Sequence, residues 1–260
     1  GVGAGVLASD TSSLSIDPRT PTAEAAILLL ELLGEYVLIA LLVLNAFLIR
    51  RLFRQREGDE IRQRMGRFFS LSAILSSTAV ILSSLFFLYL KARELSLLTG
   101  EHFNDALLSL LHTNSGEAAV IRLVLACTIG FLFYFFRKSI WEKNRFTFIE
   151  GILAVLTCAL MFYRATISHA SAAHILPDLA VGVNMLHLFD KGLIIGTLFL
   201  MACVVLPLVS RAEELQVRAR LLVSRIILWG LLIGGVSASY IAWLHLKDWS
   251  NIHSDWGYRF

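Results

Sequence analysis

The sequence is poor in charged residues. Only 17% of its 260 residues are Asp, Glu, Lys or Arg, whereas 57% are hydrophobic. A soluble globular domain has about 25% charged and 45–50% apolar residues, so this chain has too few polar residues to cover a surface that faces water. The same apolar excess excludes intrinsic disorder, which requires low hydrophobicity. The class that remains is a polytopic helical membrane protein.

Cysteine is also scarce. Cys127, Cys158 and Cys203 all fall within apolar runs and show no Cys-x-x-Cys spacing, which indicates neither a disulfide framework nor a thiolate metal site. The sequence has no P-loop, dinucleotide fingerprint or nucleophile–base motif, so we do not expect an enzyme. The net charge of +3 does not indicate a nucleic-acid partner, because Lys and Arg occupy short loops between apolar stretches.

What the sequence does have is long apolar runs. A helix that crosses the hydrocarbon core needs about 20 mostly apolar residues, and transmembrane β-strands would instead alternate apolar and polar residues. These runs are continuously apolar, which predicts an all-α membrane bundle with six spans. The predicted spans are 27–49, 68–90, 118–136, 148–167, 179–208 and 224–245.

The loops predict how the bundle is oriented in the membrane. Lys and Arg are concentrated between spans one and two, three and four, and five and six, which the positive-inside rule places in the cytoplasm. Residues 1–24 then form an extracytoplasmic segment before a transmembrane domain of residues 25–260, and loops 91–117 and 168–178 also lie outside. Segment 95–111 is expected to form an amphipathic helix, either along the outer interface or packed on the bundle.

All the histidines fall on the predicted outer side, in outer loops or in the outer half of a span. They are His102, His112, His169, His174, His187, His245 and His253. Histidine is the commonest metal ligand, and imidazole suits copper and zinc. This distribution favours a protein that takes up a metal from outside. The alternative is that outer loops simply carry polar residues.

The fifth span contains polar residues within an apolar helix. Helical periodicity places Asn184, His187 and Lys191 on one face, with Asp190 beside them. Ionisable groups at membrane depth cost at least a few kcal/mol each unless they are paired or hydrated, so this stretch is a candidate functional site. The alternative is an Asp190–Lys191 pair that fixes the bundle. Met185 is a further candidate, because a thioether suits Cu(I).

The first span supplies a second candidate cluster. Glu31 and Glu35 are four residues apart and share a helix face in the outer part of the span. They are expected to meet a metal, a proton or Lys191, or else to be solvated. Arg122 lies a few residues into the third span, and its ordinary explanation is snorkelling to the outer headgroups.

A short motif occurs twice at matching positions in the topology. His112–Gly116 follows the second span and His253–Gly257 follows the sixth, and both read His-[Ser/Thr]-[Asn/Asp]-x-Gly. Both follow a span that runs from inside to outside. A parallel repeat of a four-helix unit would produce this match, and it predicts two more helices after residue 260.

Several short motifs occur in a fixed order along residues 25–260. They are Thr113, Gly116 and Arg122 around the third span, Ser168–Ala170 after the fourth, Asn184–Leu188 and Gly196 in the fifth, and Ser254–Gly257 after the sixth. Their order resembles that of the copper resistance protein D (CopD/PcoD) family. The chain departs from the family at Asp190–Gly192, where the family has Trp-x-Gly.

The resemblance implies an eight-helix bacterial inner-membrane protein for copper import or handling, with a periplasmic CopC-like copper protein as a partner. By position, His169 and His187 correspond to the family's histidines. Copper would be captured outside by His112, His169, His174 or His253 and passed to His187 and Met185. Two alternatives remain open. One is a non-catalytic accessory subunit of a larger membrane complex, such as a copper enzyme, and the other is a haem protein with His187 and His169 or another outer histidine as axial ligands.

Overall fold

The structure is a computed structural model that describes residues 20–53, 59–142, 147–166 and 177–246, almost entirely as helix. Six helices are long and apolar enough to cross a membrane. They are Ala25–Leu52, Glu60–Thr99, Asn114–Phe135, Phe148–Thr166, Asp178–Val209 and Glu213–Trp243. Each contains most or all of one span predicted from the apolar runs. The prediction of an all-α polytopic bundle with six spans is confirmed.

Two of the spans combine α-helical and π-helical segments, whereas a single α-helix forms each of the other four. The first span comprises α1 (Thr20–Leu44), η1 (Asn45–Ile49) and α2 (Arg50–Leu52). The fifth comprises α8 (Pro177–Lys191), η3 (Gly192–Gly196), α9 (Thr197–Leu200), η4 (Met201–Val205) and α10 (Leu206–Val209). The other helices are α3 (Asp59–Thr99), α4 (Phe103–Leu111), α5 (Asn114–Phe135), α6 (Arg137–Glu142), α7 (Phe148–Thr166) and α11 (Glu213–Leu246). The π turns insert into continuous helix, a feature common near functional sites.

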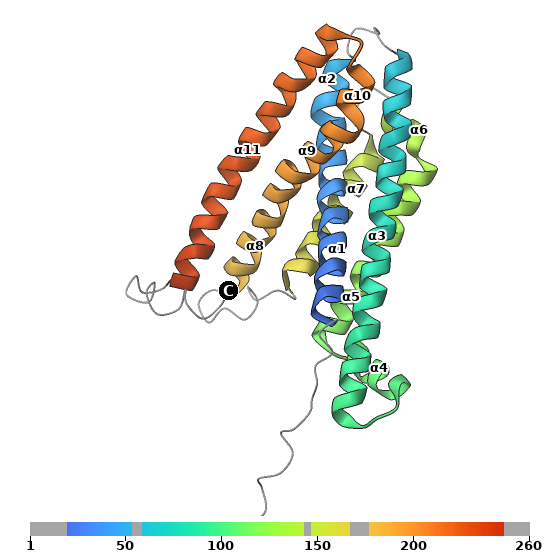
Figure 1. Ribbon diagram of the computed structural model, residues 1–260, viewed down its shortest axis with the longest axis vertical. Coiled ribbons are helices and arrows are strands. Elements are labelled where there is room, and N and C mark those ends of the chain that lie inside the picture. The colour runs from blue at the N-terminus through green and yellow to red at the C-terminus, as the bar shows by residue number, and fades with distance from the viewer. Residues whose placement is uncertain (1–19, 54–58, 143–146, 167–176, 247–260) are drawn as a thin grey trace, which may run out of the picture.

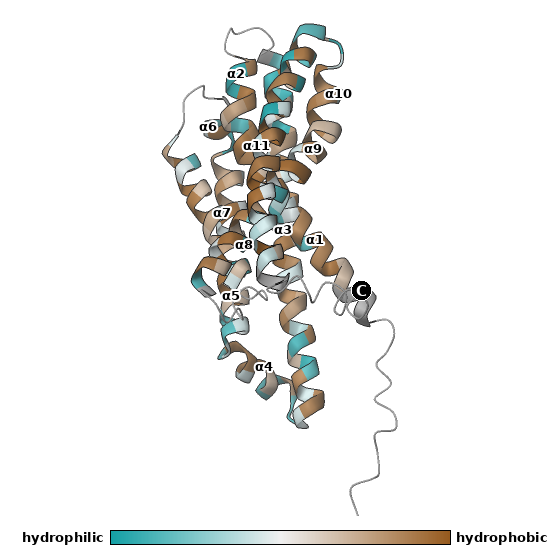
Figure 2. Ribbon diagram, turned by 90° about the vertical axis from the view of Figure 1, so that its left-hand side faces the viewer, coloured by the Kyte–Doolittle hydropathy of each residue, from teal (hydrophilic) through white to brown (hydrophobic). Residues whose placement is uncertain are grey.

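The spans run alternately up and down (Figure 1), as expected for helices joined by short connections. The helix ends that flank the three basic loops therefore lie at one end of the bundle, at the top of Figure 1. Hydrophobic residues follow the middle of the helices, and hydrophilic residues concentrate near their ends (Figure 2). This distribution of polarity fits a protein whose middle lies in hydrocarbon.

The first span is the most buried. In its most apolar window 56% of the residues are buried, against 22% in the sixth span. Helix α1 contacts α3, α7, α8 and η3, and its Leu38, Leu41 and Leu44 are completely buried. Side chains on the outside of α11, such as Trp229 and Val236, are exposed. Polar side chains on α1 therefore face protein, whereas much of α11 faces outward.

Two glycines allow the fifth span to approach α1 closely. A Cβ atom added at Gly196 would lie 2.1 Å from the Tyr36 carbonyl oxygen, and one added at Gly192 would lie 2.6 Å from Ile39 Cδ1. Glycines four residues apart lie on the same helix face and let two backbones touch, as in many transmembrane helix pairs. The Gly192–Gly196 spacing thus fixes η3 against α1.

The connection between the second and third spans is helical and packed on the bundle. Residues 95–99 of the predicted amphipathic segment continue α3, the chain turns at Gly100 with a positive φ of 73°, and α4 follows. In α4, Leu110 is buried in a small apolar cluster with Leu88 and Ala92 of α3. This contact favours the packed alternative over a helix lying along the interface.

Candidate functional site

Buried polar side chains form three clusters within the described part of the chain. The histidine cluster contains His187, Asp190 and Ser237. The four-charge cluster contains Glu31, Glu35, Arg122 and Arg164, and the Glu150 cluster contains Asn45, Arg50, Thr147 and Glu150. Each cluster joins at least two spans, so each fixes the packing of helices against one another.

The histidine cluster lies between α8 and α11. His187 Nδ1 is 3.1 Å from Asp190 Oδ2 and 3.2 Å from Ser237 Oγ, and the Ser237 hydroxyl donates to Asp190 Oδ2 over 2.9 Å. Asp190 and Ser237 are each 2% exposed, whereas the His187 side chain is 24% exposed. Because His187 and Asp190 are three residues apart, they share a helix face.

The partners of His187 favour one tautomer. An ionised carboxylate only accepts hydrogen bonds, so contact with Asp190 favours a proton on Nδ1 that is donated to it. The other ring nitrogen, Nε2, then carries a lone pair, and no hydrogen bond joins it to any residue that the structure describes. Metal-binding histidines have this arrangement, with one nitrogen held by a carboxylate and the other on the metal.

The three side chains do not form a catalytic triad with a serine nucleophile. In such a triad the serine and the carboxylate contact opposite nitrogens of the imidazole. Here Ser237 and Asp190 both face Nδ1, and the serine hydroxyl donates to the carboxylate. The geometry therefore suits orientation of the His187 ring and not activation of Ser237.

Glycines in α11 make room for the cluster. A Cβ atom added at Gly234 would lie 3.1 Å from Asp190 Oδ2, and one added at Gly230 would lie 2.8 Å from Ile194 Cγ1. The resulting close approach brings Ser237, one turn after Gly234, to Asp190. We did not predict Ser237 from the sequence, because helical periodicity within α11 does not fix its register against α8.

The other polar residues of the fifth span surround this cluster without completing it. Lys191 is partly buried, and no ion pair joins it to Asp190 in the described structure, so the alternative of an Asp190–Lys191 pair is wrong. Asn184 is partly buried one turn before His187. Met185 packs against the main hydrophobic core and projects about 200° around the helix from His187, so these two side chains do not share a face.

The four-charge cluster joins the first, third and fourth spans. Arg122 on α5 is ion-paired with Glu31 and, at 2.7 Å, with Glu35 on α1. Arg164 near the end of α7 lies 2.5 Å from the other oxygen of Glu31. Two carboxylates thus face two guanidinium groups. Such pairing permits charged side chains at membrane depth, where unpaired charges are strongly disfavoured.

These contacts differ from what the sequence led us to expect. Arg122 is 3% exposed and points to the carboxylates, so the snorkelling explanation is wrong. Glu31 and Glu35 are buried rather than solvated, and their partners are arginines rather than Lys191. Sequence reasoning missed Arg164, although a cation near the end of an apolar span was an available signal.

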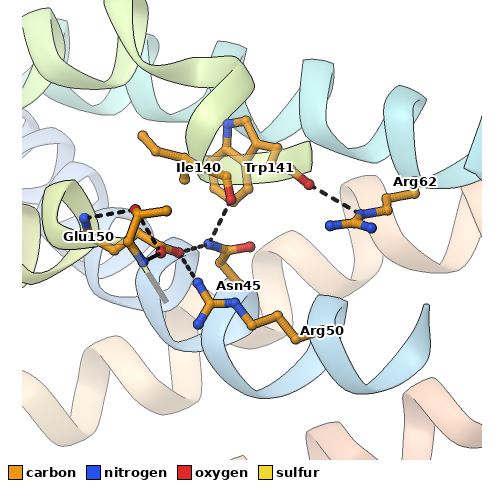
Figure 3. Close-up of polar contacts among 7 residues, drawn as sticks. Asn45, Arg50, Arg62, Ile140, Trp141 and Glu150 are labelled. Atoms are coloured by element: carbon orange, nitrogen blue, oxygen red, sulfur yellow. Dashed lines mark hydrogen bonds and ion pairs between the residues drawn. The ribbon is translucent and has the colours of Figure 1, made fainter. Parts of the chain in front are cut away.

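The Glu150 cluster was also missed (Figure 3). Asn45 Nδ2 and Arg50 Nη2 both donate to Glu150 Oε1. The other oxygen of Glu150 accepts from the Thr147 backbone N–H at 2.6 Å and from its hydroxyl at 2.9 Å. Thr147 and Glu150 have the Thr-x-x-Glu spacing of a helix capping box, a signal that was available in the sequence. This cluster ties η1 to the start of α7 and is structural.

The Thr113–Gly116 motif also has a structural explanation. Thr113 is the N-cap of α5, and its hydroxyl oxygen accepts a hydrogen bond from the Gly116 N–H over 3.1 Å. A Cβ atom added at Gly116 would lie 2.1 Å from the Leu110 carbonyl oxygen, so only glycine fits. His112, at the end of α4, is exposed.

Several predicted metal ligands cannot be compared with the structure. His169, His174 and His253 lie outside the described residues. Within the described ranges, no group of three or more His, Cys, Asp or Glu side chains is placed to hold a metal ion. Of the histidines predicted as ligands, His187 is thus the one that the structure places among buried polar partners. The copper ligand set stays a prediction.

Comparison with known proteins adds no relative. No protein-family model matches the chain, and searches of curated proteins and of solved structures find no match. The resemblance to the copper resistance protein D family, which comes from the sequence motifs, stays a prediction.

Proposed function

We propose that this multi-pass membrane protein binds copper as its cargo and that His187 is the ligand within the membrane. The observation that carries the proposal is the histidine cluster. Asp190 and Ser237 contact Nδ1 of His187 at 3.1 and 3.2 Å, which favours Nε2 as the available nitrogen. A carboxylate on one nitrogen orients a metal-binding imidazole and raises its basicity.

The proposal includes a route. In the bacterial inner membrane the histidine-rich loops face the periplasm, where His112, His169, His174 or His253 takes copper from a periplasmic copper protein. His187 receives the ion about 15 Å along α8 from Pro177, since a helix rises 1.5 Å per residue. Met185 supplies a thioether on nearly the opposite side of the helix, for use at another step of transfer.

The four-charge cluster has a supporting role in this proposal. Its two guanidinium groups match its two carboxylates, so it adds no net charge near the path. The carboxylates are already engaged by arginine, which makes Glu31 and Glu35 poor candidates for copper ligands. They instead hold α1 against α5 and α7, and α1 in turn supports the fifth span.

Metal analysis and a visible spectrum of the purified full chain test the proposal. The protein is incubated with Cu(I), freed of excess copper, and its copper content is measured by mass spectrometry for wild type, His187→Ala and His102→Ala. His102 is an exposed histidine next to α4 and serves as the matched control. We expect bound copper in wild type and His102→Ala and its loss in His187→Ala.

Other results would overturn the proposal in distinct ways. A Soret band that disappears in His187→Ala would identify a haem protein, because the same free nitrogen can serve as an axial ligand. Copper binding that is equal in all three proteins would remove His187 from the site. A sample that holds neither copper nor haem and co-purifies with fixed partners would favour the accessory subunit.

A further inference from the structure

Glu35 differs from the other buried glutamates of the described chain in how its carboxyl group is satisfied. It is completely buried, and its Oε1 accepts a hydrogen bond from Arg122 Nη2 at 2.7 Å. Its Oε2 is also buried but has no hydrogen-bond partner within the described residues. Both oxygens of Glu31 are paired with arginine, and both oxygens of Glu150 accept hydrogen bonds. Glu35 is thus the buried glutamate with an unsatisfied carboxyl oxygen.

The arginines of the four-charge cluster are engaged mainly by Glu31. Arg164 pairs with one oxygen of Glu31, and Arg122 Nη2 donates to the other oxygen as well as to Glu35. The Nε atom of Arg122 is buried without a hydrogen-bond partner among the described residues. Arg122 therefore meets Glu35 through one shared nitrogen, whereas a strong arginine–carboxylate pair is bidentate. Glu35 is the less firmly held of the two carboxylates.

Charges on three helices act on Glu35. The positive charges of Arg122 on α5 and Arg164 on α7 favour its ionised form, and the negative charge of Glu31, one turn earlier on α1, opposes it. Because Glu31 already engages both arginines, the balance of charge at Glu35 is close.

The other neighbours of this part of α1 leave that balance unchanged. Tyr36 follows Glu35 in the chain, and the charges of Glu35 and of Asp190 on α8 both act on its hydroxyl. Asp190 is not among the charges that act on Glu35 itself. Residues 70–88 of α3, and the segments η3 and α9, contain no titratable side chain. The state of Glu35 is therefore set within the four-charge cluster.

Proton uptake by Glu35 would break no contact in the described cluster. A buried carboxyl group costs far more free energy when ionised than when neutral, unless its charge is fully paired. A proton on Oε2 removes the charge, and Oε1 can still accept the hydrogen bond from Arg122, because a protonated carboxyl group keeps acceptor capacity. Glu31 meanwhile keeps both of its arginines.

We propose that Glu35 is a proton-binding site inside the membrane, where Oε2 takes up a proton from water while Glu31 stays ionised between Arg122 and Arg164. The carboxylate becomes a neutral carboxylic acid, no electron is transferred, and the net charge of the four-charge cluster rises by one unit. Ionisable carboxyl groups at membrane depth mark the proton relays of pumps and transporters. The site does not depend on copper or on His187.

Infrared difference spectroscopy of the copper-free full chain in detergent tests the site, because a protonated carboxylic acid has a C=O stretching band apart from those of ionised carboxylates. Spectra are recorded between about pH 6 and about pH 9, where exposed carboxyl groups, with an ordinary pKa of about 4, are ionised. We expect a carboxylic acid band in wild type that shifts in heavy water and is lost in Glu35→Gln. Two control variants should retain it. They are Glu150→Gln, at a buried glutamate with both oxygens satisfied, and Glu60→Gln, at an exposed one.

A second variant keeps the test decisive if Glu35→Gln fails to fold, which circular dichroism checks. Glu35→Asp retains a carboxyl group on a shorter side chain, so the band should move in frequency or disappear, whereas a band from another residue would not change. Absence of a carboxylic acid band in wild type would overturn the proposal. A band at unchanged frequency in Glu35→Gln or Glu35→Asp would also overturn it, because the proton would then belong to another side chain. Copper content, measured separately, decides the copper proposal.

Discussion

The four-charge cluster and the histidine cluster both place ionisable groups inside the bundle, but they satisfy them differently. Glu31 and Glu35 are matched by Arg122 and Arg164, and Glu35 is completely buried. Asp190 is instead satisfied by an imidazole and a hydroxyl. The first arrangement is closed to solvent and balanced in charge, and within the described residues Glu35 Oε2 and Arg122 Nε are buried without a hydrogen-bond partner.

The histidine cluster is open by comparison. The His187 side chain is 24% exposed, and one of its nitrogens is held while the other remains available. Buried carboxylates that are paired with arginines hold helices together, whereas a carboxylate that orients a histidine prepares that histidine for a ligand. The comparison teaches that burial of charge alone does not identify a functional site, because the partner decides the role.

The largest expected loss of stability comes from breaking the four-charge cluster. Arg122→Gln leaves Glu31 and Glu35 buried with one guanidinium group between them, and removal of one partner from a buried pair costs about 3–5 kcal/mol. Arg64→Gln is the matched control, because Arg64 pairs with Glu60 on an exposed helix face, where a pair contributes about 0–1 kcal/mol. In detergent, the midpoint of thermal unfolding should be clearly lower for Arg122→Gln than for Arg64→Gln. Equal midpoints would show that the four-charge cluster does not hold the helices.

A smaller loss of stability should follow from opening the contact between the fifth span and α1. Gly196→Ala places a methyl group against the Tyr36 carbonyl oxygen, and overpacking of this kind costs about 1–3 kcal/mol. Gly182→Ala, in the same span, meets nothing within 4 Å and should stabilise the helix slightly. Thermal unfolding again provides the measurement. A Gly196→Ala protein as stable as Gly182→Ala would mean that η3 and α1 are farther apart than described.

A change in the histidine cluster should lower the affinity for copper rather than the stability of the protein. Asp190→Asn keeps the shape of the side chain but removes its charge, and loss of such a partner lowers metal affinity by about 10–100-fold. Competition with a chromophoric Cu(I) chelator measures the change. Glu35→Gln is the matched carboxylate control in the closed cluster, and its copper affinity should stay near that of wild type. A larger loss of affinity in Glu35→Gln would reverse the roles assigned to the two clusters.

The smallest expected effect concerns the helix that carries Arg122. Thr113→Ala removes the N-cap of α5 and costs about 1 kcal/mol, whereas Ser115→Ala, two residues later on an exposed face, should be nearly neutral. Copper affinity should not change in either variant. A loss of copper in Thr113→Ala would show that the Thr113–Gly116 motif acts beyond its structural role.

The long apolar runs made the six spans predictable, since about 20 apolar residues are enough to indicate a helix. Glu31, Glu35, Arg122, His187 and Asp190 were also found, because polar side chains stand out in an apolar run. Their partners were not. Arg164 and Ser237 come from other helices, and the rotation and register of one helix against another depend on side-chain packing between them rather than on the period of either.

The close helix contacts at glycines could likewise be predicted only in part from the sequence. The spacing of Gly192 and Gly196 indicates a helix contact, but the sequence does not say that the partner is Tyr36 or that Gly234 faces Asp190. The paired alternative for Asp190 and Lys191 failed because adjacent residues point about 100° apart on a helix. The copper assignment and the two further helices stay predictions.

X-ray absorption at the copper edge tests the central claim most directly, because it reports the ligands of the bound ion. Copper-loaded wild type and His187→Ala are compared, with His102→Ala as the control. The open histidine cluster predicts imidazole scattering in wild type and in His102→Ala, with one imidazole fewer, or no copper, in His187→Ala. Identical spectra for the three proteins would contradict the claim that His187 receives copper.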